Sequence, residues 1–284
     1  MKISDIYKEK NRQNKSVVSL EVFPPQTSQG EKTIFNTVSG LTKKPDYISV
    51  TYRGNSGNKT LEIAKKIKED TGIEVLHHLT AVQNSHQDMA KILKNIEQAG
   101  LENILALRGD LPKDFDANIK GEYLLARDLI TDIKQRECFS VGAATYPEGH
   151  VSSPLDIENI EHLRQKYDAG ADFFVSQLFF ENERFYRLNE AIKTARITAP
   201  VTAGIMPIMS TANVERLIFF GASIPTKLIK IINKYKDNPE DLRKAGLEYS
   251  LEQIDDLLAH GVDGVHIYTM NRPSVANVIM ERYL

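Results

Sequence analysis

Eight short apolar runs, most of them separated by helix-patterned segments, constrain the fold of this chain more than any other feature. The runs are Val17–Phe23, Tyr47–Thr51, Glu74–Leu79, Asn103–Arg108, Ser140–Thr145, Phe173–Gln177, Val201–Ile205 and Gly264–Tyr268. Strands that alternate with helices form parallel β/α units, and eight such units can close into a (β/α)8 TIM barrel. The 284 residues are close to the ~250 typical of that fold, so we predict a single α/β barrel domain over residues 1–284.

Polar or ionisable residues stand at or just after the C-terminal end of every predicted strand. They are Glu21, Thr51, His78, Arg108 with Asp110, Tyr146, Gln177, Ser210, and Tyr268 with Arg272. The active site of a TIM barrel lies at this end of the strands. The pattern therefore predicts an enzyme whose acid, base and hydrogen-bonding groups meet at one mouth.

Composition excludes several other classes of protein. Lys and Arg number 36 against 38 Asp and Glu, whereas a nucleic-acid binder normally shows a basic excess. A single cysteine, Cys138, rules out an intramolecular disulfide and a multi-cysteine metal site. The polar N-terminus lacks a signal-peptide core, and no apolar run approaches the ~18 residues needed to span a bilayer. We expect a cytoplasmic protein that binds neither nucleic acid nor membrane.

Glu21 is a carboxylate inside an apolar strand. Such a position is costly unless the side chain reaches a polar cavity, where it can act as a general acid. The alternative is a glutamate on the outer strand face, paired with a lysine outside the barrel. Spacing alone favours neither interpretation.

Arg108, Gly109 and Asp110 place opposite charges around a glycine at a strand end. The glycine lets the backbone approach a ligand closely, but the two charges are equally consistent with an ion pair at a loop tip.

In His77-His78, strand alternation allows only one imidazole to face the barrel interior. No HxH or HExxH spacing is present, so we expect no metal site.

Gln177 ends a strand and is followed by Leu178-Phe179-Phe180. Its amide can hydrogen-bond the edge of a heterocycle. The two phenylalanines could form a wall against a flat ring, or they could belong to the ordinary hydrophobic core.

Neither GxGxxG nor GxxxxGK[ST] occurs, so a dinucleotide would not be held by a Rossmann unit. The glycines of segment 53–57 indicate a turn.

Taken in order, these motifs resemble those of methylenetetrahydrofolate reductases. The matching segments are Ser19–Pro25, Val50–Tyr52, His78–Thr80, Ala106–Pro112, Tyr146–Glu148, Asp168–Asp172 with Gln177–Phe180, Gly204–Pro207 and His266–Arg272. The resemblance covers nearly the whole chain, and Arg-Gly-Asp-Leu-Pro and Tyr-Thr-Met-Asn-Arg are its most specific parts. The sequence is similar to the short bacterial form, without the C-terminal regulatory domain of the animal enzymes.

The resemblance implies a barrel that binds FAD non-covalently. NADH or NADPH passes hydride to the flavin and leaves, and 5,10-methylenetetrahydrofolate then enters the same position and is reduced to 5-methyltetrahydrofolate. The expected kinetics are ping-pong, the product supplies methyl groups for methionine synthesis, and the family suggests a homo-oligomer. No Rossmann selector distinguishes NADH from NADPH.

The resemblance also implies roles for individual residues. Glu21 matches the general acid that helps to open the folate ring to an iminium cation, and Asp110 matches a carboxylate beside the flavin and the pterin. The positions implied in substrate binding are Glu21, Thr51, Asp110, Gln177 and Arg272. Those implied in cofactor binding are Thr51, Tyr52, His78, Arg108, Gly109, Asp110, Ala126, Tyr146, His150, Asn159, His162 and Lys166, of which Lys166 and His150 could neutralise a pyrophosphate.

Four departures from the family pattern affect the outer contacts. Arg53-Gly54 replaces a Gly-Ala pair, Gln165 replaces a basic residue, Asn159 replaces a ribose-binding aspartate, and Leu217 stands where a phenylalanine can stack on substrate.

Two other functions compete with the reductase. A pterin-binding barrel methyltransferase would need no flavin, and a silent assembly subunit would need neither Glu21 nor Asp110.

Overall fold

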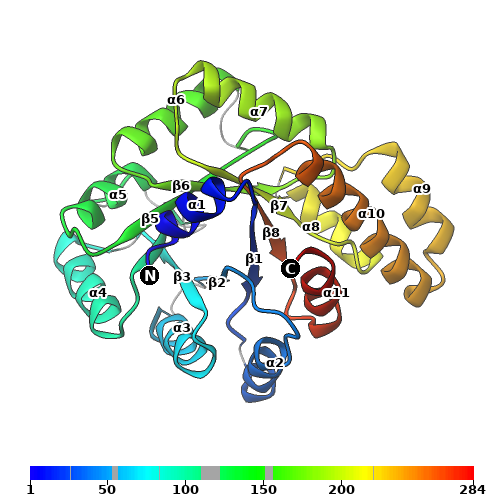
Figure 1. Cartoon of the computed structure of the whole chain (residues 1–284), viewed down its shortest axis with the longest axis horizontal. Helices are drawn as coiled ribbons and strands as arrows, with labels where there is room; N and C mark the ends of the chain where they lie inside the picture. Colours follow the sequence, from blue (N-terminus) through cyan, green and yellow to red (C-terminus); the bar gives the residue numbers. More distant parts are fainter. Residues whose placement is uncertain (26, 53–56, 83, 110–121, 151–155, 220) are drawn as a thin grey trace.

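The computed structural model describes residues 1–25, 27–52, 57–82, 84–109, 122–150, 156–219 and 221–284. Eight parallel strands close into a barrel in the order β1-β2-β3-β4-β5-β6-β7-β8 (Figure 1). The strands are β1 (Val17–Val22), β2 (Tyr47–Val50), β3 (Glu74–Thr80), β4 (Asn103–Leu107), β5 (Ser140–Thr145), β6 (Phe173–Leu178), β7 (Val201–Ile205) and β8 (Gly264–Tyr268). The predicted TIM barrel is confirmed, with each strand within two residues of its predicted end.

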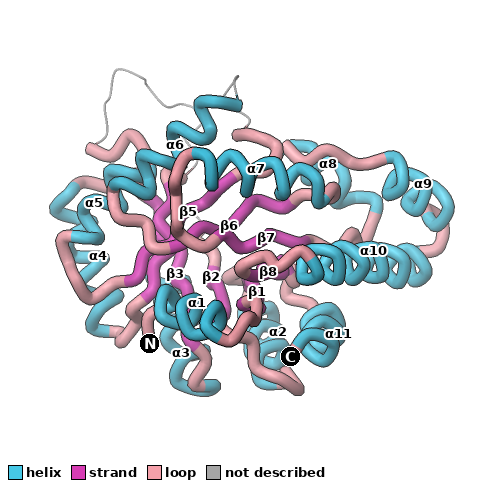
Figure 2. The backbone as a smooth tube through the Cα atoms, turned by 45° about the horizontal axis from the view of Figure 1, so that its top comes forward, coloured by secondary structure: helices cyan, strands magenta, loops and turns pink. Residues whose placement is uncertain are grey.

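Helices surround the barrel on the outside (Figure 2). They are α2 (Ser28–Ser39), α3 (Gly57–Thr71), α4 (His86–Gln98), α5 (Ala126–Lys134), α6 (Asp156–Asp168), α7 (Asn182–Thr194), α8 (Val214–Phe219), α9 (Thr226–Tyr235), α10 (Pro239–Ala259) and α11 (Pro273–Tyr283). Side-chain caps fix several helix starts, such as Ser85 at α4, whose hydroxyl accepts the amide hydrogen of Asp88. The predicted loop over residues 110–121 and most of the predicted turn over 53–57 lie outside the described residues. None of the described helices has the length and apolar character needed to cross a membrane.

The N-terminal helix α1 (Ile3–Arg12) was not predicted from the sequence. It lies across one end of the barrel (Figure 1), where Ile3 and Tyr7 are buried. The Ile3 amide donates to Asn103 Oδ1 at 2.7 Å, and the Tyr7 hydroxyl hydrogen-bonds Thr202. Because Ile3, Ile6 and Tyr7 are the only apolar or aromatic residues of α1, the apolar periodicity is too weak to indicate a helix.

Side chains that point into the barrel change from apolar to polar along the strands. The end covered by α1 is filled by an apolar cluster that includes Val17, Tyr47, Leu76, Leu105 and Phe173. Towards the C-terminal ends the interior residues are instead Ser19, Glu21, Ser49, His78 and His266. The outward-facing residues pack against the helices, and Phe179 and Phe180 are buried in this packing, so the aromatic run after Gln177 is core.

His77 faces the helix layer, as alternation requires when His78 faces the interior. It is 2% exposed, and its Nδ1 has no hydrogen-bond partner among the described residues. Burial lowers the pKa of His77 to about 4. The unfolded chain, with a histidine pKa of about 6.5, therefore binds more protons between these two values, and stability falls as the pH drops through that window.

We expect His77→Leu to remove this part of the pH dependence. The two pKa values imply that the wild type loses about 2 kcal/mol of unfolding free energy between pH 7.5 and pH 5. The variant should not show this loss. Urea unfolding at the two pH values measures the difference. Parallel losses in the two proteins would contradict the assignment to His77.

Candidate active site

Glu21 points into the barrel and meets two imidazoles there. Its Oε2 lies 3.5 Å from His78 Nε2 and 3.4 Å from His266 Nε2, and all three side chains are buried. Ser49 Oγ is 2.6 Å from His78 Nε2, and Ser19 Oγ is 2.8 Å from His266 Nδ1. The alternative of an outward glutamate paired with a lysine is therefore wrong.

The two histidines bring ring nitrogens within 3.5 Å of the Glu21 carboxyl. Burial lowers the pKa of His78 well below its usual range, and the nearby imidazoles of His266 and His77 act in the same direction, so His78 is neutral at neutral pH. A neutral imidazole nitrogen can either donate or accept, and Ser49 and Ser19 can do the same. The Glu21 carboxyl is therefore enclosed by side chains that can donate or accept hydrogen bonds.

Tyr268 forms the next part of the interior wall. Its hydroxyl donates to the Ser176 carbonyl at 2.9 Å, and its ring lies edge-on to His266 at 5.3 Å between centroids. Burial, followed by the charge of Glu21, raises the pKa of Tyr268 well above its usual value, so the phenol stays protonated. Gly204 makes room for this ring, because a Cβ there would lie 2.9 Å from Tyr268 Cε2 and 2.3 Å from the Ser176 oxygen.

Three predicted substrate-binding residues lie at strand ends around the same mouth. Thr51 follows β2, and its amide donates to the Val22 carbonyl of β1 at 3.1 Å. Gln177 is half-buried on β6, where its Oε1 accepts the Leu178 amide at 3.0 Å. Arg272 is exposed at the N-cap of α11, just after β8.

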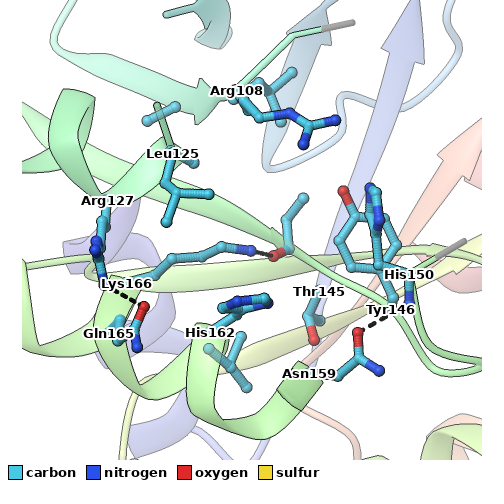
Figure 3. A pocket seen from close by; sticks show the side chains of 15 residues that line it. Arg108, Leu125, Arg127, Thr145, Tyr146, His150, Asn159, His162, Gln165 and Lys166 are labelled. Carbon is cyan, nitrogen blue, oxygen red and sulfur yellow. Dashed lines mark hydrogen bonds between the residues drawn. The ribbon is translucent and has the colours of Figure 1, made fainter. Parts of the chain in front are cut away.

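A pocket lies over the C-terminal ends of β4 and β5, between these strands and helices α5 and α6 (Figure 3). In the barrel order, β4 is next to β3, which carries His78. Five lining residues are basic, and the described lining includes no aspartate or glutamate. The lining residues are Ala106, Leu107, Arg108, Leu125, Ala126, Arg127, Ala144, Thr145, Tyr146, His150, Asn159, His162, Leu163, Gln165 and Lys166. This set of side chains suits an anionic ligand.

Lys166 reaches across the pocket from α6 (Figure 3). Its ammonium donates to the Ala144 carbonyl at 2.8 Å and lies 5.7 Å from the centre of the Tyr146 ring. Burial lowers the pKa of Lys166 to about 8, because the charged form loses its hydration. An anion bound in the pocket would restore that stabilisation, which makes Lys166 the lining residue most sensitive to a ligand's charge.

Two further contacts fix the shape of the pocket. Asn159 Oδ1 accepts the His150 backbone amide at 2.9 Å, and the Tyr146 and His150 rings meet edge to face at 4.7 Å. Gln165 Oε1 accepts from Arg127 Nη1 at 2.5 Å. Asn159 and Gln165, where the sequence departs from the family pattern, therefore order the pocket's own side chains.

The structure gathers seven of the predicted cofactor residues in this pocket: Arg108, Ala126, Tyr146, His150, Asn159, His162 and Lys166. Thr51, Tyr52, His78 and Gly109 belong instead to strands or strand ends around the barrel mouth. Asp110 lies outside the described residues, so its predicted role stays a prediction. The cofactor and substrate roles of the other positions also remain predictions.

Two features of the site differ from what the sequence suggested. Leu217 is 1% exposed and packs in a buried cluster with Leu178 and Phe180, whereas the family pattern has a phenylalanine there that can stack on substrate. His266 was not singled out, although it precedes Tyr268 by two residues and alternation places both on one strand face. This two-residue spacing could have identified His266 from the sequence.

The described residues contain no group of three His, Cys, Asp or Glu side chains that could hold a metal ion.

A closed (β/α)8 barrel with a buried carboxyl at its mouth and a cationic pocket beside it belongs to the class of TIM-barrel proteins whose site suits an anionic ligand. Residues 6–283 match the family described as methylenetetrahydrofolate reductase. The 5,10-methylenetetrahydrofolate reductase of Escherichia coli is 32% identical over 266 residues, which cover 92% of this chain and 88% of that protein. The chain belongs to the methylenetetrahydrofolate reductase family.

Eukaryotic relatives are longer than this chain. Methylenetetrahydrofolate reductase 1 of Schizosaccharomyces pombe is 34% identical over 99% of this chain but only 48% of its own length. Methylenetetrahydrofolate reductase (NADH) 1 of Arabidopsis thaliana is 31% identical over 95% of this chain and 49% of its own length. The chain thus spans about half the length of these two relatives.

Solved structures support the fold. An uncharacterized protein from Clostridium thermocellum that binds two copies of 5-methyl-5,6,7,8-tetrahydrofolic acid has a TM-score of 0.66 at 14% identity, over 97% of this chain and 99% of that one. Oxaloacetate acetylhydrolase has a TM-score of 0.55 at 13% identity, over 98% of this chain and 83% of its own. At these identities the similarity concerns the barrel alone.

Proposed function

We propose that this chain reduces 5,10-methylenetetrahydrofolate to 5-methyltetrahydrofolate, with FAD bound non-covalently and NADH or NADPH as reductant. The observation that carries the proposal is the buried Glu21 carboxyl between two imidazoles at the barrel mouth, next to a cationic pocket, in a chain of this family. We further propose ping-pong turnover by this barrel alone, a homo-oligomeric state, a cytoplasmic location, and a role in supplying methyl groups for methionine synthesis.

The pocket residues fit the pyrophosphate of FAD. Arg108 and Lys166 offer charge-assisted hydrogen bonds to phosphate oxygens, and no described lining residue would repel them. When bound there, FAD would accept hydride from the nicotinamide and return it to the folate. Tyr146 and His150 would shape the pocket around the cofactor, since their rings are already in contact.

Glu21 would supply the proton that the folate ring needs to open. Its position inside the barrel keeps water away from the carboxyl, and His266 Nε2 can hydrogen-bond it at 3.4 Å. Gln177 on β6 and Arg272 just after β8 would hold the folate from two strand ends that only β7 separates. Asp110, by its place in the family motif, is proposed to contact the pterin.

The purified protein should be yellow, and anaerobic NADH or NADPH should bleach its absorbance near 450 nm. A later addition of 5,10-methylenetetrahydrofolate should restore the colour with formation of 5-methyltetrahydrofolate. Comparing the two nicotinamides in this assay also decides which one is the reductant. A colourless protein that cannot be reconstituted with FAD would favour the pterin-binding methyltransferase.

A further inference from the structure

The chain leaves β8 through two consecutive left-handed residues that are not glycine. Met270 has φ 52° and Asn271 has φ 55°. Asparagine tolerates this region better than most residues, whereas methionine does so only at a cost in free energy. Backbone strain of this kind persists where surrounding contacts hold the conformation in place.

The side chain of Asn271 forms those contacts with the end of β1. Its Oδ1 accepts the Phe23 amide at 2.9 Å, and its Nδ2 donates to the Phe23 carbonyl at 2.9 Å. One amide thus satisfies both backbone groups of a residue that lies just beyond the strand. The Asn271 side chain thus extends the hydrogen bonding between β1 and β8 beyond the paired strand residues.

Thr269 makes a second link between the same two strands. Its hydroxyl donates to the Glu21 carbonyl at 2.7 Å and accepts the Asn271 amide hydrogen at 3.2 Å. Thr269 is 1% exposed, so these bonds are shielded from water. We call Thr269 and Asn271 together the β1–β8 brace.

The brace begins where the regular strand pairing ends. The last paired residues of β1 and β8 are Glu21 and Tyr268. Without the brace, the backbone of Glu21 would be held by β2 and by its own strand, but its link to the β8 end would stop at Tyr268. The Arg272 amide also donates to the Thr269 carbonyl at 3.0 Å, so the start of α11 is fixed to the same residue.

We propose that Asn271 is a positioning residue for the reaction, because the β1–β8 brace holds Glu21 and Arg272 at one mouth in a fixed relation. The inference rests on the proposed function. It assigns Asn271 no contact with substrate, and it gives the asparagine side chain a role that glycine could not fill at this left-handed position.

Asn271→Gly is the most informative variant, because glycine adopts the left-handed conformation freely and only the side-chain bonds are lost. We expect single-turnover folate reduction to fall at least ~10-fold, since misplacing a reacting group by about 1 Å can cost ~10²-fold. Reduction of the bound flavin by NADH or NADPH should stay within about 3-fold of wild type, because it needs no proton from Glu21. Titration calorimetry with 5-methyltetrahydrofolate should show weaker binding through the displaced Arg272.

Asn14→Gly is the matched control. Asn14 also has a left-handed φ of 52°, but it lies exposed between α1 and β1 at the opposite end of the barrel. Thr269→Val removes the hydroxyl's bonds to the Glu21 carbonyl and the Asn271 amide but keeps the Asn271 side chain, and Thr269→Ser should restore both bonds because the hydroxyl returns. If Asn271→Gly folds poorly, the Thr269 pair still decides the question.

Folate reduction and product binding at wild-type levels in Asn271→Gly and Thr269→Val would overturn the positioning role. Equal losses in both half-reactions would overturn it too, because they would indicate general damage. A wild-type protein that binds FAD but never reduces the folate contradicts the proposed function together with this inference, whereas wild-type-like variants of an active enzyme contradict only the inference.

Discussion

Glu21→Gln should abolish most of the folate half-reaction and leave the nicotinamide half-reaction nearly intact. The amide keeps the shape of the side chain and its place between His78 and His266, but it cannot give up a proton at neutral pH. Loss of a general acid usually costs ~10²–10⁴-fold, and we expect at least ~10²-fold here. Anaerobic rapid mixing of each substrate with the enzyme measures the two rates separately.

Glu183→Gln is a suitable control for this experiment. It makes the same chemical change on the exposed surface of α7, where Glu183 pairs with Arg187 at 3.1 Å. Both half-reactions should match the wild type in that variant. Equal slowing of both half-reactions by Glu21→Gln would instead indicate that Glu21 serves the structure of the barrel and not the proton transfer.

The barrel could be predicted because each strand has a recognisable local sequence pattern. Runs such as Val201–Ile205 are short, apolar and bounded by turn residues, and the helices between them show their own periodicity. Helix α1 carries only Ile3 and Tyr7 as buried residues, so its place depends on a barrel end that exists only after the strands close. Local pattern cannot supply such a signal.

The sequence predicted polar residues at the strand ends, but not the contacts that these residues make. Glu21 and His266 are 245 residues apart, and only the pairing of β1 with β8 brings them to 3.4 Å. Register also decides that His78, and not His77, meets Glu21, whereas alternation alone leaves both possible. Seven of the predicted cofactor residues line one pocket, but the buried setting of Lys166 depends on how α6 packs over β5.

Lys166→Met should weaken FAD binding by ~10–100-fold. The methionine keeps the length and apolar stem of the side chain but removes the charge, and a hydrogen bond to a charged group is worth about 1.5–3 kcal/mol. Quenching of FAD fluorescence by the flavin-free protein measures the affinity. Lys193→Met, on the exposed face of α7, is the matched control and should bind FAD like the wild type.

The pH dependence of FAD binding gives a second, independent test of Lys166. Its pKa of about 8 in the ligand-free protein means that the ammonium is charged at pH 7 and largely neutral at pH 9. Because the pyrophosphate favours the charged form, it raises this pKa on binding, so affinity is full below pH 8 and is lost as the pH rises through the raised value. The wild type should therefore lose affinity between pH 7 and pH 9, while Lys166→Met stays nearly constant. The same decline in both proteins would show that another group titrates, and that Lys166 does not face the phosphates.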